Sequence, residues 1–320
     1  MRKNAFESPA NKKDYQNGMG RRALQSYLKY GYIPLEDSVP DAFHTKEQVS
    51  RTLEYAYDDF VLSQVAKKLQ KNEDYKLLSA RALNYRNVID PQTDYAQGRH
   101  TDGTFLKEQN AFQFAKFITE GAPCHYTWYV PHDPYGLMEY MGGKEKFALK
   151  LDSMFSEHRY WHGNEPCHQV AFMFNYAGEP WKTQQAVRHI METEYLNAPG
   201  GLSGNDDAGQ MSAWYIFASL GFYPVCPGSP FYVLASPSFP KAVLHLENGK
   251  SFILQAENAS EENIYIQKVT LNGKAYTKNY ISHKDIIAGG EMVFTMGNTP
   301  NKTWGNTPED CPPSLIEVAE

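Results

Sequence analysis

The spacing of apolar residues changes once along the chain, near residue 231. Before that point they recur every three or four positions, as at Val49, Leu53 and Tyr57. After it, apolar and polar residues alternate, as in residues 242–247. The first spacing is typical of an amphipathic helix and the second of a half-buried strand. The sequence therefore predicts a mainly α chain that ends in a small β module.

Five helices are predicted before residue 231. The sequence Thr45-Lys46-Glu47-Gln48 has the form of a capping box, in which Ser or Thr is followed three residues later by Glu or Gln. We expect a helix to begin there. Gly221 is placed as the C-cap of the last helix. Long loops that contain Gly and Pro separate the helices, which favours an α-helical toroid over a compact bundle. The other helices are expected over residues 74–90, 143–155, 181–195 and 209–220.

The β module is predicted over residues 231–306. Asn248-Gly249 and Asn272-Gly273 are dipeptides typical of type I′ hairpin turns, and strand-like segments flank both. Because strands joined by such turns run antiparallel, the module is expected to be antiparallel. The predicted domains are thus a helical region over residues 1–230, the β module, and a tail over residues 307–320.

Charge and hydropathy exclude several classes of protein. The formal net charge is −6 and no basic run occurs, so nothing indicates a nucleic-acid partner or an anionic membrane surface. No apolar stretch approaches the roughly 18 residues that a membrane-spanning helix needs. Residues 1–7 are not followed by the apolar segment of a signal peptide. The four cysteines form no CxxC pair, and their redox state stays open.

The first loop that suggests chemistry runs from Thr119 to Asp133. It sets Glu120 close in sequence to Tyr126, Trp128 and Tyr129. Apolar surroundings raise the pKa of a carboxyl group, because desolvation disfavours its charged form, and this suits a general acid. A glutamate that caps a helix or pairs with an arginine fits the same pattern. Aromatic residues also stack on sugar faces, but they are first of all core material.

The second loop runs from Trp161 to His168. Asn164 and Glu165 offer oxygen atoms, which hard cations such as Ca²⁺ prefer. His162 and His168 suggest zinc instead, but the second His or Cys pair of a zinc site is missing. An ordinary turn, with Pro166 at the first position of a helix, explains the segment equally well. No EF-hand motif occurs.

The third loop runs from Gly204 to Tyr215 and contains Asp206 and Asp207. Two carboxylates before a helix can be its N-cap and first-turn anions. Alternatively, one of them is a general base or a metal ligand. Together the three loops predict paired-carboxylate chemistry, as in glycoside hydrolysis, where an acid protonates the leaving oxygen and a second carboxylate acts opposite it. No G-x-S-x-G, Walker or Rossmann motif competes with this interpretation.

Five segments in this order resemble glycoside hydrolase family 92, a family of exo-acting, calcium-dependent α-mannosidases that invert the anomeric centre. The resemblance covers residues 16–304 and implies most of an (α/α)6 barrel followed by the β module. The five segments are Leu53–Asp59, Thr119-Glu120-Gly121, Tyr129–Asp133, His162–Pro166 and Gly204–Tyr215.

The resemblance implies a role for each of several residues. Glu120 corresponds to the catalytic acid and Asp207 to the base that activates water. Calcium would be held by Asn164 and Glu165, with help from the acidic loop around Asn205 and Asp207, and would bind the 2- and 3-hydroxyls of the terminal mannose. The weaker candidates, for contact with the substrate, are Glu54, His132, Asp133 and His162.

The same resemblance implies a substrate and a location. The substrate would be terminal α-linked mannose of an oligosaccharide, either an N-glycan or a mannan, with an α-1,2 linkage as one option. Family members are commonly exported by bacteria, which implies a periplasmic, cell-surface or secreted protein.

Three features depart from the family pattern. Residues 122–126 read Ala-Pro-Cys-His-Tyr where the family usually has Asn-Ala-Trp-Gln-Tyr. The loop between Lys150 and His162 is short. Family members are about twice as long and carry an N-terminal β-sandwich and further barrel helices. We therefore expect an incomplete catalytic region. The alternatives are a truncated or inactive calcium-dependent mannose-binding fragment and an α-helical interaction scaffold.

Overall fold

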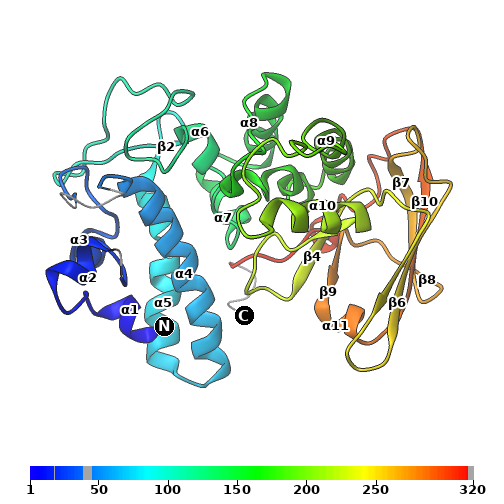
Figure 1. Cartoon of the computed structure of the whole chain (residues 1–320), viewed down its shortest axis with the longest axis horizontal. Helices are drawn as coiled ribbons and strands as arrows, with labels where there is room; N and C mark the ends of the chain where they lie inside the picture. Colours follow the sequence, from blue (N-terminus) through cyan, green and yellow to red (C-terminus); the bar gives the residue numbers. More distant parts are fainter. Residues whose placement is uncertain (18, 39–44, 316–320) are drawn as a thin grey trace. The chain divides into compact units, whose positions relative to one another are not determined.

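The computed structural model describes residues 1–17, 19–38 and 45–315. The chain forms two compact units, Met1–His132 and Asp133–Glu320, which are taken here one at a time (Figure 1). Within the described residues, no helix is both long enough and apolar enough to cross a bilayer. The last five residues of the predicted tail, 316–320, lie outside the described part of the chain.

The first unit is built around an antiparallel helix pair, α4 and α5, whose apolar stripe forms its core (Figure 1). Leu53, Ala56 and Phe60 of α4 are all buried, because positions three and four apart lie on one face. The elements of this unit are α1 (Arg2–Phe6), α2 (Lys12–Gln16), α3 (Leu24–Tyr30), α4 (Gln48–Lys68), α5 (Asn72–Arg81), the 3₁₀ helix η1 (Ala82–Val88), β1 (Ile89–Asp90), β2 (Tyr95–Ala96) and α6 (Pro123–Tyr126).

The predicted capping box at Thr45 is wrong. Helix α4 begins at Gln48, and its N-cap residue Glu47 makes no side-chain capping bond. The backbone carbonyl of Phe117 instead accepts hydrogen bonds from the amides of Val49, at 3.0 Å, and Ser50, at 3.3 Å. A distant loop therefore satisfies the amides that a capping side chain would have bound.

The helix predicted over residues 74–90 is correct only in its first half. Helix α5 ends at Arg81, and η1 and β1 follow. The imidazole Nε2 of His132 binds the carbonyl of Ala82 at 2.9 Å, and the Tyr27 hydroxyl donates to the carbonyl of Arg81 at 3.4 Å. These side chains bind carbonyls that a continuing α-helix would have used for its own hydrogen bonds.

The second unit begins with helices and 3₁₀ turns. Helices α8, α9 and α10 confirm the predictions over residues 143–155, 181–195 and 209–220. Gly221 is the C-cap of α10, with φ of 89°, as predicted. The helical elements are α7 (Pro134–Tyr140), α8 (Lys144–Ser156), η2 (Glu165–Cys167), η3 (Val170–Asn175), α9 (Pro180–Thr193), α10 (Gln210–Leu220), α11 (His283–Ile287) and η4 (Pro308–Asp310).

The strands of the second unit form two sheets, one of order β5-β6-β10-β7-β8 and one of order β3-β4-β9 (Figure 1). Strand β10 lies parallel to β6 and antiparallel to β7. The prediction of a wholly antiparallel module is therefore wrong, because β10 inserts between two strands instead of following its neighbour through a hairpin. The strands are β3 (Phe222–Tyr223), β4 (Phe231–Leu234), β5 (Lys241–His245), β6 (Ser251–Glu257), β7 (Tyr265–Leu271), β8 (Lys274–Ala275), β9 (Tyr280–Ser282) and β10 (Gly290–Gly297).

The two predicted hairpin turns differ in type. Asn272 and Gly273 have φ of 49° and 75° and join β7 to β8, as a type I′ turn requires. At the other turn Gly249 has a positive φ but Asn248 does not, so this turn is not type I′. The amide of Gly249 donates to the carbonyl of Leu246 at 3.0 Å, and the Asn248 side chain donates to the carbonyl of Ile287 at 2.8 Å.

Two buried asparagines join the helical and sheet parts of this unit. The Asn175 amide donates to the carbonyls of Leu234 and Asn279, both at 2.9 Å. The Asn279 amide donates to the carbonyls of Asn175, at 3.0 Å, and Gly305, at 2.7 Å. These bonds cross residue 230, where a domain boundary is predicted. That boundary, and the arrangement of the helices as part of an (α/α)6 toroid, stay predictions.

Candidate active site

Glu120 lies on an anchored loop of the first unit, residues 114–121, called here the Glu120 loop. Its anchors are the Glu47 amide, which donates to the carbonyl of Lys116 at 3.0 Å, and the Thr119 amide, which donates to the hydroxyl of Ser50 at 2.7 Å. Glu120 itself is exposed and has φ of 49°. A positive φ is uncommon for a residue other than glycine, and such positions concentrate at functional sites.

The aromatic residues near Glu120 in sequence do not enclose it within this unit. Tyr126 and Trp128 are buried in the core of the unit, whereas the Glu120 side chain is exposed. The desolvation that was expected to favour a general acid is therefore not supplied by the first unit itself.

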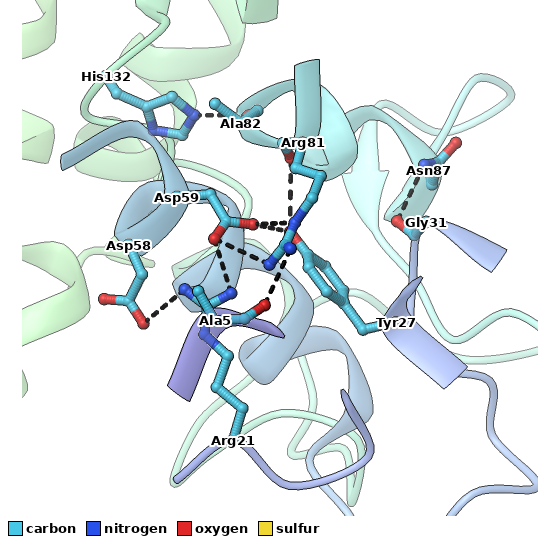
Figure 2. Close-up of polar contacts among 10 residues, drawn as sticks. All are labelled: Ala5, Arg21, Tyr27, Gly31, Asp58, Asp59, Arg81, Ala82, Asn87 and His132. Atoms are coloured by element: carbon cyan, nitrogen blue, oxygen red, sulfur yellow. Dashed lines mark hydrogen bonds and ion pairs between the residues drawn. The ribbon is translucent and has the colours of Figure 1, made fainter. Parts of the chain in front are cut away.

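Two of the predicted substrate-binding residues have partners within the first unit. Glu54, on α4, is hydrogen-bonded to the Tyr129 hydroxyl; burial first, and then the charge of Glu54, raise the pKa of that hydroxyl. His132 is 2% exposed, and Figure 2 shows its ring directed at the Ala82 carbonyl. Its ring lies 5.5 Å from that of Phe60. These contacts favour a structural role for His132.

The two adjacent aspartates of the acidic loop, residues 204–209, have different partners. The Asp206 carboxylate accepts hydrogen bonds from the Ser212 amide, at 2.9 Å, and from the Ser212 hydroxyl, at 3.0 Å. It thus caps the first turn of α10. The Asp207 side chain is exposed, has φ of 47° at its backbone, and makes no hydrogen bond to any described residue. The two neighbours thus differ, since Asp206 caps the helix and the Asp207 carboxylate is not engaged in this cap.

The predicted calcium ligands lie on two loops that touch through their backbones. A Cβ placed on Gly204 would lie 2.2 Å from the carbonyl oxygen of Gly163. Glycine is therefore required at position 204, and Asn164 and Asn205 each follow one of the two contacting glycines. Glu165 begins the 3₁₀ helix η2 directly afterwards. The structure thus brings together the segments that contain Asn164, Glu165 and Asn205.

The predicted ligands on these two loops of the second unit, Asn164, Glu165 and Asn205, all have side-chain oxygen atoms. Two amide side chains and one carboxylate match the ligands that a hard cation such as Ca²⁺ prefers. Across the described residues, no group of three or more His, Cys, Asp or Glu side chains is arranged to hold a metal ion. The donor set therefore depends on the two asparagines and fits calcium better than it fits zinc.

His162 is buried in an aromatic cluster beside these loops. Its Nδ1 lies 2.7 Å from the Tyr160 hydroxyl, and its Nε2 lies 2.6 Å from the Tyr195 hydroxyl. Because the Tyr195 hydroxyl donates to the carbonyl of Met211 at 3.0 Å, it accepts from Nε2–H, and Nδ1 accepts from Tyr160. Both ring nitrogens are therefore engaged, which favours a structural role for His162.

Burial, and then the neighbouring His168, lower the pKa of His162 to about 3. In the unfolded chain an imidazole titrates near 6.5. Between about pH 6.5 and 3 the unfolded state therefore binds the proton more readily, so stability falls as the pH falls. His162→Gln should flatten this loss, which reaches roughly 1.4 kcal/mol per pH unit for one group.

The measurement is the free energy of unfolding in urea from pH 7 down to pH 4. His189→Gln is the matched control, because His189 is exposed and should leave the slope of the wild-type protein unchanged. If the free energy of unfolding changes with pH equally in His162→Gln and the wild-type protein, the loss of stability at low pH does not come from His162.

Asp133 is fully buried and caps helix α7. Its carboxylate accepts hydrogen bonds from the Gly136 amide, at 3.1 Å, and from the Ser314 hydroxyl, at 3.3 Å. These bonds favour a structural role over the predicted contact with a sugar.

One polar centre of the first unit was not predicted. Asp59 is fully buried and is bound by Arg21, Arg81 and Tyr27 (Figure 2). Its position on the buried face of α4, in register with Ala56 and Phe60, is the sequence signal that could have identified it. An acid on an apolar stripe needs a partner.

Comparison with known proteins identifies the family. The model of the glycosyl hydrolase family 92 catalytic domain matches residues 1–298. The chain belongs to glycoside hydrolase family 92. This confirms the resemblance found in the sequence motifs.

Solved structures of family 92 share the fold. An α-mannosidase from Bacteroides thetaiotaomicron is 41% identical, with a TM-score of 0.87, and the match covers 97% of this chain and 40% of that one. An inverting mannosidase from the same organism is 36% identical, with a TM-score of 0.86, over 93% of this chain and 43% of that one.

A curated relative is also described as a glycosidase. A secreted glycosidase of Arthroderma benhamiae is 30% identical over 323 residues, which are 92% of this chain and 41% of the relative. The chain thus spans about two fifths of the length of these relatives.

Proposed function

We propose that the chain is the catalytic part of an exo-acting α-mannosidase, which removes terminal α-linked mannose with inversion. The observation that carries the proposal is the Asp207 carboxylate, which is exposed and unengaged among the described residues beside a capping Asp206. The family 92 relatives support it, since one is described as an α-mannosidase, one as an inverting mannosidase, and one structure holds mannoimidazole.

The roles of the two carboxyl groups follow from the chemistry of inversion. Glu120 donates a proton to the leaving glycosidic oxygen, and Asp207 takes a proton from the attacking water on the opposite face of the sugar. Glu120 is held by the backbone contacts of its loop with α4. Asp207 is held by the start of α10, where the Gln210 amide donates to the carbonyl of Asp206 at 2.8 Å. Each group is thus held within its own unit, and a catalytic group that is already held in place lowers the entropic part of the barrier.

Asn164, Glu165 and Asn205 are the proposed calcium ligands, because their oxygen donors lie on loops joined at Gly163 and Gly204. Calcium bound there would supply positive charge to hold sugar hydroxyls and support distortion of the ring. His162 and His168 brace the loop: the Nε2 of His168 bonds the carbonyl of His162 at 3.0 Å, and Trp214 donates to the carbonyl of His168 at 2.9 Å.

The proposed substrate is a mannose-containing oligosaccharide, from an N-glycan or a mannan. Glu54 remains the best placed of the weaker candidates for contact with it, because its side chain is only partly buried. Export to the periplasm, the cell surface or the medium is proposed on the description of the Arthroderma relative as secreted.

The experiment is release of mannose from α-linked mannobioses by the purified protein, with and without a calcium chelator. We expect hydrolysis, a loss of at least about ten-fold on chelation, and recovery on addition of Ca²⁺. Proton NMR of the first product should show β-mannose.

Each other outcome of this experiment contradicts one part of the proposal. Hydrolysis that is insensitive to the chelator contradicts the calcium site, and α-mannose as first product contradicts inversion. Calcium-dependent binding of mannose without hydrolysis would replace the enzyme by a mannose-binding fragment.

A further inference from the structure

A groove of about 440 Å³ in the first unit contains Glu120 in its wall. Residues that line it include Lys46, Phe114, Lys116 and Ile118. All of them belong to the first unit, so the groove is a property of that unit alone. Its volume is sufficient for a ligand of a few hundred Å³.

The loop that forms the groove buries some of its side chains and directs others outward. Ala115, Phe117 and Ile118 are buried, while Phe114 and Lys116 face outward with Glu120. The backbone bonds to the start of α4 fix this pattern, since they hold the loop at Lys116, Phe117 and Thr119. Phe114 is 69% exposed, and its ring packs on no other ring of the described residues. An aromatic face is thus presented beside Glu120 on a fixed backbone.

The groove presents side chains of both charges. Lys46, Lys116 and Glu120 line it, while the carboxylate of Glu47 is already paired with Arg51 at 3.3 Å. Such a lining offers both donors and acceptors for hydroxyl groups. A sugar has these two features, an apolar face for an aromatic ring and a rim of hydroxyls.

We propose that this groove binds the leaving-group sugar of the substrate, with Phe114 stacked on its ring and Lys46 and Lys116 donating to its hydroxyls. The inference rests on the proposed function, in which Glu120 is the acid. A general acid protonates the leaving oxygen, so the space beside it receives the group that leaves. Phe114 is then a residue that determines specificity for the leaving group.

The test compares two substrates for Phe114→Ala. An α-mannobiose has a leaving-group sugar, whereas the leaving group of α-mannosyl fluoride is a single atom that does not reach the groove. We expect kcat/KM to fall about ten-fold on the mannobiose, the size of one lost aromatic contact with its buried area. Activity on the fluoride should be unchanged. Phe114→Trp should restore most of the activity on the mannobiose.

Phe112→Ala is the matched control. Phe112 is 40% exposed, does not line the groove, and packs against Tyr95 with ring centroids 5.3 Å apart. It should leave the ratio of the two activities as in the wild-type protein. Equal losses on both substrates for Phe114→Ala, or no loss on either, would overturn the proposal.

Failure of the proposed function is a separate outcome, in which the wild-type protein cleaves neither substrate. Saturation-transfer NMR with the mannobiose then tests whether the groove binds the second sugar. The proposal is supported if saturation is transferred to the protons of the second sugar in the wild-type protein and this transfer is lost in Phe114→Ala. Transfer that is absent, or that survives the substitution, overturns it. A mannosyl phosphate that is cleaved in preference to the mannobiose would also overturn the choice of a neutral leaving group.

Discussion

Asp207→Asn should lower kcat on an α-mannobiose by about a thousand-fold, within the usual contribution of a general base. The thermal stability of the protein should not change, because the Asp207 carboxylate makes no hydrogen bond to any described residue. Asparagine keeps the shape of the side chain and tolerates the left-handed backbone at this position. The two measurements are initial rates and the unfolding midpoint.

Asp206→Ala is the matched control from the same loop. It removes the acceptor of the Ser212 amide and hydroxyl, so the free energy of unfolding should fall by about 1 kcal/mol, as when a side chain that binds a first-turn amide of a helix is lost. Its kcat should stay within a few-fold of the wild-type value. If Asp206→Ala abolishes activity and Asp207→Asn leaves it intact, the assignment of the base to Asp207 is wrong.

The sequence predicted the helices that depend on their own periodicity. Helices α8, α9 and α10 each have an apolar face and formed within two residues of the expected ends. Predictions failed where a residue far away in the sequence supplied the hydrogen bond at a helix end. The carbonyl of Phe117 took the place of the Thr45 cap, and His132 bound the carbonyl of Ala82, where α5 gives way to η1. Neither contact has a local sequence signal.

In the candidate site, too, local features could be predicted and contacts between distant residues could not. Residue types and loops could be predicted, because glycines and acids cluster in residues 162–168 and 204–209. The local residue pattern could not separate Asp206 from Asp207, since both precede a helix and the choice depends on backbone angles. Only the resemblance to family 92 singled out Asp207. The local pattern also could not show that Gly204 contacts Gly163, which brings the two loops together.

The second large effect is expected at Asp59, in the first unit. Its carboxylate binds Arg21 at 2.7 Å and Arg81 at 2.7 and 2.9 Å, and Arg81 also donates to the carbonyl of Ala5 at 2.9 Å (Figure 2). Asp59→Ala leaves both guanidinium groups with no carboxylate at this position. We expect the free energy of unfolding to fall by about 3–5 kcal/mol, the usual cost of breaking a buried ion pair from one side.

Asp58→Ala is the matched control, one residue away on the same helix. The Asp58 side chain is 58% exposed and lies 3.5 Å from Arg21, so its loss should cost less than about 1 kcal/mol, as for surface ion pairs. Both variants are measured by urea unfolding. Equal effects would mean that the exposed pair matters as much as the buried one, and would contradict the prediction. A selective effect of Asp59 would show that α4 is joined through Arg81 to α5 and the N-terminal segment, and that the helix which presents Glu54 depends on this ion pair.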